Sequence, residues 1–230
     1  MRGMQQSLMI IFIVGIVSTL LGTVIGAIAG FFRGWIDSLL MRFTDLIIII
    51  PLLLLAAILG ATFGKAGSFV LAIVIGALVW TSLARLVRGE VLALREREFV
   101  DAARVAGASS NRIIFRHILP NSVGVIIVSA TLVMSSAILL EASLSFLGLG
   151  VQAPDVSLGS LLNQYQTSFT TRPWLFWWPG SFIVIISLTI NFIGDGLRDA
   201  FDPRQKRMLN RTAKVARSQA REKPATSQEA

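Results

Sequence analysis

The stretch REREFVDAARVAGASSNRIIFRHILP, residues 95–120, separates two long apolar runs and decides how the rest of the chain is interpreted. It is charged and follows a helical pattern, whereas the runs on either side of it are almost free of charge. Connections between the helices of a bundle usually need only a few residues. This connection is much longer, so we predict that it forms a docking surface and does not merely reverse the chain.

The first part of this stretch has the periodicity of a helix. Apolar and small residues recur at intervals of three or four and would form one helix face: Phe99, Val100, Ala103, Ala106 and Gly107. Asp101 and Arg104 lie on another face, three positions apart, and can form an ion pair.

The second part carries turn signals. Gly107 can adopt the positive φ that ends a helix, and Ser109 or Ser110 can cap a second helix by accepting a backbone N–H. Pro120 cannot continue that helix without losing a hydrogen bond, but the first turn of a new helix tolerates it. We therefore predict a short rigid elbow: helix, glycine turn, helix, proline and next span.

The composition is that of an integral membrane protein. Of the 230 residues, 54% are hydrophobic and only 15% are charged, against about 25% charged in a typical soluble domain. The chain has no cysteine, which excludes disulfides, iron–sulfur clusters and thiolate zinc sites. The net charge of +8 comes from basic residues that flank the apolar runs, as topogenic signals do, so we predict no nucleic-acid partner.

Five apolar segments predict an all-α protein with about five transmembrane helices. They cover residues 7–32, 35–63, 69–86, 121–149 and 175–193. The first could be confused with a signal peptide ending near Ala27 and Ala29, but its apolar run is too long for such a leader. Small residues in it recur every fourth position and would let another helix approach closely: Ser18, Gly22, Gly26 and Gly30.

Features within the other segments are more ambiguous. Pro51 predicts a kink midway along the second segment, and Arg42 with Asp45 can neutralise one another near a membrane interface. Trp80 in the third segment can line a substrate pathway or pack in the core. Glu141 lies near the outer end of the fourth segment and can line an outer gate or fill a structural hydrogen-bonding role.

The distribution of basic residues predicts the orientation. If the long stretch faces the cytoplasm, eighteen of the 21 Lys and Arg residues fall on that side, and only Arg2, Lys65 and Arg172 fall outside. Such asymmetry is the usual sign of the cytoplasmic side. The N-terminus is then outside and the C-terminus inside.

The spacing of residues in the stretch resembles a known family. Asp101-Ala102-Ala103, then Gly107, then Leu119-Pro120 resemble the EAA loop of ABC importer permeases, with Asp101 in place of the usual Glu and His117 in place of a common Ile. The segments GASSNRIIFRHILPN, EASLSFLGLGVQ from Glu141 and GDGLRDAFDPR from Gly194 are similar to the dipeptide, oligopeptide and nickel branch. The likeness runs from about residue 7 to 204.

The resemblance implies a fold, a function and partners. It implies the type I importer permease fold in a bacterial or archaeal plasma membrane, with the elbow acting as a coupling helix on cytoplasmic ATPases. It implies a second permease, two ATP-binding subunits that hold ATP and Mg, and an extracytoplasmic substrate-binding protein that meets an external loop. The residues expected to couple transport to the ATPases are Glu98, Asp101, Ala102, Ala103, Gly107, Leu119 and Pro120.

The domain organisation follows from these expectations. We predict a permease domain over residues 1–204, with a coupling loop at about 88–120 and an external loop at about 148–173. A basic, disordered cytoplasmic tail is expected over 205–230, in contact with water or with anionic lipid. The first helix usual in the family, and the Gly-Thr-Asp…Gly-Arg-Asp signature after it, are not found in the sequence.

Several chemistries are excluded or disfavoured. The sequence contains no Gly-x4-Gly-Lys-Ser/Thr loop for phosphates, so we predict a transport subunit without its own ATPase site or cofactor. With one histidine, metal sites of the HExxH type and Ser–His–Asp catalysis are disfavoured. An intramembrane lipid-modifying enzyme using Asp45 or Glu141, or an ion-coupled carrier, remains as an alternative. The identity of the solute is beyond the sequence.

Overall fold

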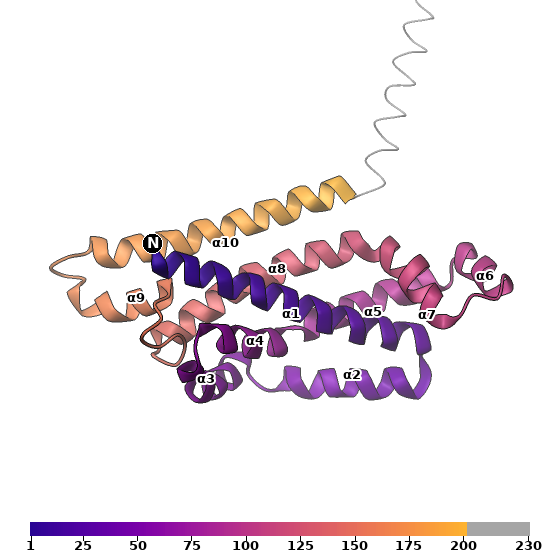
Figure 1. Ribbon diagram of the computed structural model, residues 1–230, viewed down its shortest axis with the longest axis horizontal. Helices are drawn as coiled ribbons and strands as arrows, with labels where there is room; N and C mark the ends of the chain where they lie inside the picture. The colour runs from indigo at the N-terminus through magenta and orange to yellow at the C-terminus, as the bar shows by residue number, and fades with distance from the viewer. Residues whose placement is uncertain (202–230) are drawn as a thin grey trace, which may run out of the picture.

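A long N-terminal helix, α1, is the axis of the bundle in the computed structural model, which describes residues 1–201 (Figure 1). The predicted tail over residues 205–230 lies outside the described residues. Within residues 1–201 the regular structure is entirely helical, as predicted. Its α-helices are α1 Arg2–Phe32, α2 Gly34–Ile49, α3 Leu52–Phe63, α4 Ser68–Val79, α5 Thr81–Arg95, α6 Glu98–Val105, α7 Ser110–Ile113, α8 Leu119–Phe146, α9 Leu158–Tyr165 and α10 Trp174–Phe201.

The small-residue stripe of α1 is the contact surface for α5, which confirms its predicted packing role. A Cβ added to Gly26 would lie 2.4 Å from the carbonyl oxygen of Ala84, and one added to Gly30 would lie 2.8 Å from that of Arg88. At such distances only glycine fits, so the two helix backbones approach closely along several turns. Apolar residues of α1 and α5, among them Ala27, Phe31 and Val91, form a buried cluster beside this contact.

The second and third predicted segments are each broken into two helices. α2 and α3 meet at 82° across Ile50 and Pro51, and α4 and α5 meet at 46° around Trp80. The proline explains the first break, because it lacks an N–H and its ring obstructs the preceding turn. The bend in the third segment was not predicted. The bend at Trp80 lets α4 pack its Gly76 against Val17 while α5 follows the glycine stripe of the same helix.

The fourth segment is longer than predicted and contains a local irregularity. α7, a π-helical turn over Ile114–Ile118 and α8 form one continuous helix from Ser110 to Phe146. Pro120 lies in the first turn of α8, as predicted, but no break separates α8 from the turn before it. The wider π turn immediately before it supplies the room that the proline ring and the missing N–H require.

Five crossings are consistent with the helices observed. Within residues 1–201, three helices are long and apolar enough to span a bilayer, and each bent pair supplies one more, giving up to five. α10 packs against α8, with Gly194 against Thr131 and the Ser135 hydroxyl 2.9 Å from that of Ser187. The external loop contains a short helix, α9, which starts with a capping box between Ser157 and Ser160.

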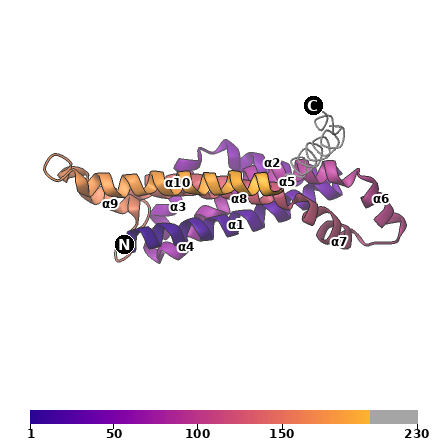
Figure 2. The same cartoon turned by 90° about the horizontal axis from the view of Figure 1, so that it is seen from above.

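The two ends of the bundle differ in what they carry. α6 and α7 project at one end, and the N-terminus and α9 lie at the other end in both views (Figures 1 and 2). Asp155, in the loop before α9, accepts hydrogen bonds from the backbone N–H and the hydroxyl of Ser68 at 3.0 and 2.6 Å. These bonds lower the pKa of Asp155 and fix the loop to the start of α4.

Candidate functional site

The predicted elbow forms as a helix–turn–helix at one end of the bundle. It consists of α6, the turn over residues 106–109 and α7, with α5 leading into it and α8 continuing from it (Figure 1). α8 runs the length of the bundle core, and α5 runs from the elbow to the bend at Trp80. A displacement of the elbow therefore acts directly on α5 and α8.

The turn that closes α6 is a Schellman motif, and it explains the spacing between Ala103 and Gly107. The N–H of Ala108 donates to the carbonyl of Ala103 at 3.0 Å, and the N–H of Gly107 donates to that of Arg104 at 2.9 Å. Gly107 has φ +78°, the left-handed conformation that this motif requires. Ala103 and Ala108, the two residues that the motif brings together, pack on the same apolar cluster.

Only one edge of α6 is buried. Val100 is fully buried and Ala103 is partly buried, and both pack against the cluster that includes Phe31, Val87 and Ile114. Phe99 and Ala106, predicted for this apolar face, are instead exposed. The helix is too short to bury five residues, so the predicted face was too wide. The buried edge is enough to fix the helix to the bundle.

The opposite side of α6 is open. Ala102 and Ala106 are exposed and Val105 is 91% exposed. Asp101 and Arg104 form the predicted ion pair at 2.9 Å. Small and apolar side chains beside charged ones, on a helix fixed from behind, are the composition of a surface that another protein can cover.

The structure corrects the prediction for the second cap. Ser109 occupies the N-cap position of α7, but its side chain makes no capping hydrogen bond. Ser109 therefore occupies a predicted cap position, but the predicted side-chain hydrogen bond does not form.

The entry to the elbow is held by ion pairs between α5 and the first two helices. Arg88 on α5 donates two hydrogen bonds to Asp37 on α2, at 2.5 and 2.6 Å, and this pair is partly buried. Arg33 pairs with Glu96 at 2.6 Å. Arg95 donates to the carbonyl of Phe31 and lies over its ring, 5.6 Å from the centroid.

Another ion pair between α2 and α5 replaces the predicted pair of Arg42 and Asp45. Asp45 pairs with Arg85 of α5 and not with Arg42, which lies on its own helix. The prediction was wrong because sequence spacing only identifies local partners, and α5 lies beside α2 in the folded chain. No local pattern indicates the long-range pairs, although α2 carries two acidic residues and α5 carries three arginines.

Glu141 lies far from the elbow, in a buried polar cluster near the opposite end. Its carboxylate accepts hydrogen bonds from Ser7 at 3.2 Å and from Ser145 at 2.7 Å. The Ser7 hydroxyl in turn accepts from the backbone N–H of Leu158, and Ser145 accepts from that of Val151. The cluster ties α1, α8 and the external loop together, in agreement with the structural role that the sequence left open.

Trp80 is buried at the bend between α4 and α5. Its ring stacks on that of Phe43 from α2, with centroids 6.2 Å apart. This is the environment of a packing residue, and a pathway role for Trp80 or Glu141 stays a prediction. Within residues 1–201 no cluster of three or more histidine or acidic side chains could hold a metal ion.

The fold and site thus define a class: a helical protein of the membrane with a rigid elbow fixed at one end of its bundle. The family described as "Binding-protein-dependent transport system inner membrane component" matches residues 22–207. The chain belongs to this family. It is a multi-pass permease component of an importer and not an enzyme, as predicted.

Individual relatives agree. The "Oligopeptide transport system permease protein OppC" of Mycobacterium tuberculosis (strain CDC 1551 / Oshkosh) is 44% identical over 204 residues, which cover 88% of this chain and 70% of the relative. A "Putative peptide permease protein" of Brucella ovis is 45% identical over 210 residues, covering 89% and 68%. The OppC protein of Haemophilus influenzae is 43% identical over 190 residues, covering 83% and 61%.

A solved structure confirms the permease fold. The inward-facing MetNI methionine ABC transporter matches with a TM-score of 0.70 over 87% of this chain and 95% of that one. Its sequence identity is 20%. The likeness therefore concerns the fold alone.

Proposed function

We propose that this chain is a pathway-forming permease subunit for peptides or similar small solutes, driven by ATP hydrolysis on separate cytoplasmic subunits. The peptide cargo is supported by relatives at 43–45% identity that are named as peptide permeases. The partners we propose are a second permease, two ATP-binding subunits and an extracytoplasmic substrate-binding protein. ATP and Mg belong to the ATP-binding subunits.

The elbow is the proposed contact with an ATP-binding subunit, and its geometry carries the proposal. α6 is fixed from behind by Val100 while its other side, with Ala102 at the centre, is open. A small side chain at position 102 lets a partner approach the helix backbone, and Glu98 and Asp101 supply charge beside it. Ala103 and Gly107 build the turn, and Leu119 and Pro120 continue the movement into α8.

The proposed mechanism is alternating access. When ATP closes the two ATP-binding subunits, the elbows of the two permeases are drawn together. α5 and α8 leave the elbow from its two ends, so its displacement tilts both helices and switches the pathway from inward-facing to outward-facing. The Asp37–Arg88 pair makes α2 follow α5 in this movement, because a bidentate Arg–carboxylate pair fixes the relative geometry of its two helices.

The orientation is part of the proposal. The elbow and the end of α10 face the cytoplasm, and α9 with the loop before it faces the substrate-binding protein. The distribution of charge supports this assignment. Arg2, Lys65 and Arg172 are the basic residues expected outside the cytoplasm, and they belong to the end of the bundle opposite the elbow. The positive side of a membrane protein is the cytoplasmic side.

Substituting Ala102 tests the proposal. The complete transporter is reconstituted in proteoliposomes with Ala102→Arg, and peptide uptake and peptide-stimulated ATP hydrolysis are measured. We expect both to fall strongly while the subunit still inserts, because a long side chain holds the partner away from the helix. Ala66→Arg, exposed at the opposite end, is the matched control and keeps normal uptake.

The same experiment separates the alternatives. Normal uptake with Ala102→Arg contradicts coupling through the elbow. Activity of the purified chain on lipids in the absence of an ATPase would favour the intramembrane enzyme, and uptake driven by an ion gradient without ATP would favour the carrier.

A further inference from the structure

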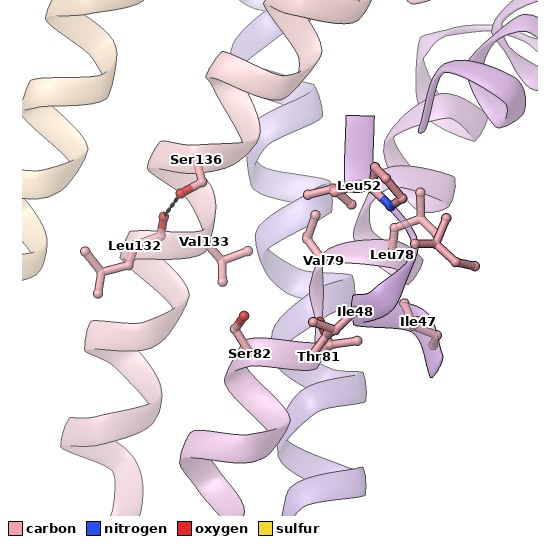
Figure 3. A pocket seen from close by; sticks show the side chains of 12 residues that line it. Ile47, Ile48, Leu52, Leu78, Val79, Thr81, Ser82, Leu132, Val133 and Ser136 are labelled. Carbon is pink, nitrogen blue, oxygen red and sulfur yellow. Dashed lines mark hydrogen bonds between the residues drawn. The ribbon is translucent and has the colours of Figure 1, made fainter. Parts of the chain in front are cut away.

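A cavity of about 440 Å³ lies where the two helix breaks of the bundle meet (Figure 3). Ile50, Pro51 and Leu52 line it at the break between α2 and α3. Val79 and Thr81 line it at the break between α4 and α5, and α8 forms the remaining wall. Its volume is within the range of about 300–1,000 Å³ that is typical of small-molecule sites.

The backbone at the first break cannot face lipid. Pro51 has no N–H, and the last carbonyls of α2 have no partner in their own helix. Ile50 and Pro51 are nevertheless exposed on the surface of this chain. Irregular backbone at membrane depth is tolerated only where protein covers it or where it lines a water-filled cavity. In the assembled transporter this face is therefore turned away from the bilayer.

The lining combines apolar walls with hydroxyl groups and carries no charge. Isoleucine, leucine and valine side chains form most of the surface, and none of the lining residues is ionisable. Thr81 is 6% exposed, and Ser82 and Ser136 are exposed (Figure 3). Ser136 already donates to the carbonyl of Leu132 at 3.0 Å, so its oxygen is left to accept. Such a surface accommodates uncharged side chains and makes hydrogen bonds without selecting for charge.

We propose that this cavity is the part of the translocation pathway contributed by this chain, and that it contacts apolar side chains and backbone amides of a peptide in transit. Thr81, Ser82 and Ser136 are the residues that donate to or accept from the peptide. The inference rests on the proposed function. It adds the location of the solute and the chemistry that the wall recognises.

The position of the cavity also links it to the elbow. α5 starts at Thr81, in the cavity wall, and ends at Arg95, next to the elbow. Its fifteen residues span about 22 Å as one helix. A tilt of α5 imposed at the elbow therefore moves the wall that carries Thr81 and Ser82. The cavity changes shape when the ATP-binding subunits close.

Cysteine labelling tests the proposal cleanly, because the chain has no native cysteine. Ser82→Cys and Ser136→Cys are introduced separately into the complete transporter in proteoliposomes, and a charged, membrane-impermeant thiol reagent is added. Leu188→Cys is the matched control: Leu188 is 50% exposed on α10, which lies on the other side of the bundle from α2 and α3 (Figure 1).

The expected result has three parts. Both cavity variants react about tenfold faster than the control, since the reactive thiolate forms in water and not in lipid. Modification stops uptake, and a peptide with apolar side chains slows the reaction. A reaction as slow as that of the control overturns the proposal, as does full modification that leaves uptake unchanged. Slow reaction together with normal uptake indicates that a partner helix fills the cavity.

The outcome also distinguishes this inference from the proposed function. If the Ser82→Cys and Ser136→Cys variants take up peptide normally but are not labelled by the reagent, the proposed function stands and only the cavity assignment is removed. If the unsubstituted transporter moves no peptide at all, the proposed function fails and the inference falls with it.

Discussion

Replacing Gly107 tests whether the shape of the elbow controls transport. A Cβ added to Gly107 would meet no atom within 4 Å, so a larger residue causes no collision. The cost comes from the backbone alone, because φ is +78°. A non-glycine residue in the left-handed region costs roughly 1–2 kcal/mol. That penalty lowers the population of the native turn about 5- to 30-fold relative to competing turns.

The variants form a graded series. Gly107→Ala carries the full penalty and Gly107→Val a larger one, because β-branched residues are least compatible with positive φ. Gly107→Asn carries less, since asparagine tolerates this conformation. Gly89→Ala on α5 is the matched control: an added Cβ again meets nothing within 4 Å, but the residue lies inside a helix, where alanine is favoured by about 0.5–1 kcal/mol.

The assay is peptide uptake and peptide-stimulated ATP hydrolysis by the complete transporter in proteoliposomes, with the amount of inserted subunit measured in parallel. We expect uptake to decrease in the order Gly107, Asn, Ala, Val at position 107, with insertion unchanged and Gly89→Ala equal to the parent. Equal uptake across the series would refute the reasoning. So would a loss in Gly89→Ala as large as that in Gly107→Ala.

Three further predictions follow from packing and hydrogen bonding. Gly26→Ala should lower the free energy of unfolding of the detergent-solubilised chain by about 1–3 kcal/mol in thermal melts, because the added Cβ collides with the Ala84 carbonyl. Gly196→Ala should not lower it, because a Cβ at position 196 lies in open space. Glu141→Leu should lower the free energy of unfolding by about 1–3 kcal/mol, because it leaves Ser7 and Ser145 without their acceptor. Glu141→Gln should lower it by less, and thermal melts of the two variants measure the difference. Asp155 has a folded-state pKa below its unfolded value, so its stabilising effect is complete above the ordinary aspartate pKa of about 3.9 and is lost as pH falls through the folded value. The stability difference between the parent and Asp155→Asn should therefore vanish on acidification, and a difference that persists at low pH would contradict this assignment.

Sequence reasoning succeeded where a local pattern determines the structure. The interval between Ala103 and Gly107 predicts the turn because a Schellman motif depends on neighbouring residues alone. The fourth-position spacing of Gly22, Gly26 and Gly30 predicts close packing for the same reason, since helix geometry places them on one face. The extent of the apolar segments predicts the crossings.

It failed where the structure depends on residues far apart in the chain. The partner of Asp45 is decided by the position of α5 beside α2, which no local pattern encodes. No proline in the sequence indicates the bend at Trp80, which follows from packing against α1. No local pattern indicates the π turn before Pro120: the proline lies in the first turn of α8, as predicted, but the helix continues through it from Ser110. The width of the exposed face of α6 likewise depends on how much of it the bundle covers.

The most direct test of the central claim is whether Ala102 touches an ATP-binding subunit. Ala102→Cys is introduced into the cysteine-free chain, the complete transporter is assembled in membranes, and a short thiol cross-linker is applied with and without ATP. The account predicts a cross-link to the ATP-binding subunit whose yield changes with nucleotide, and none from Ala66→Cys at the opposite end. A cysteine at position 102 that stays free to react with a bulky water-soluble reagent in the complete assembly, and forms no cross-link, would contradict it.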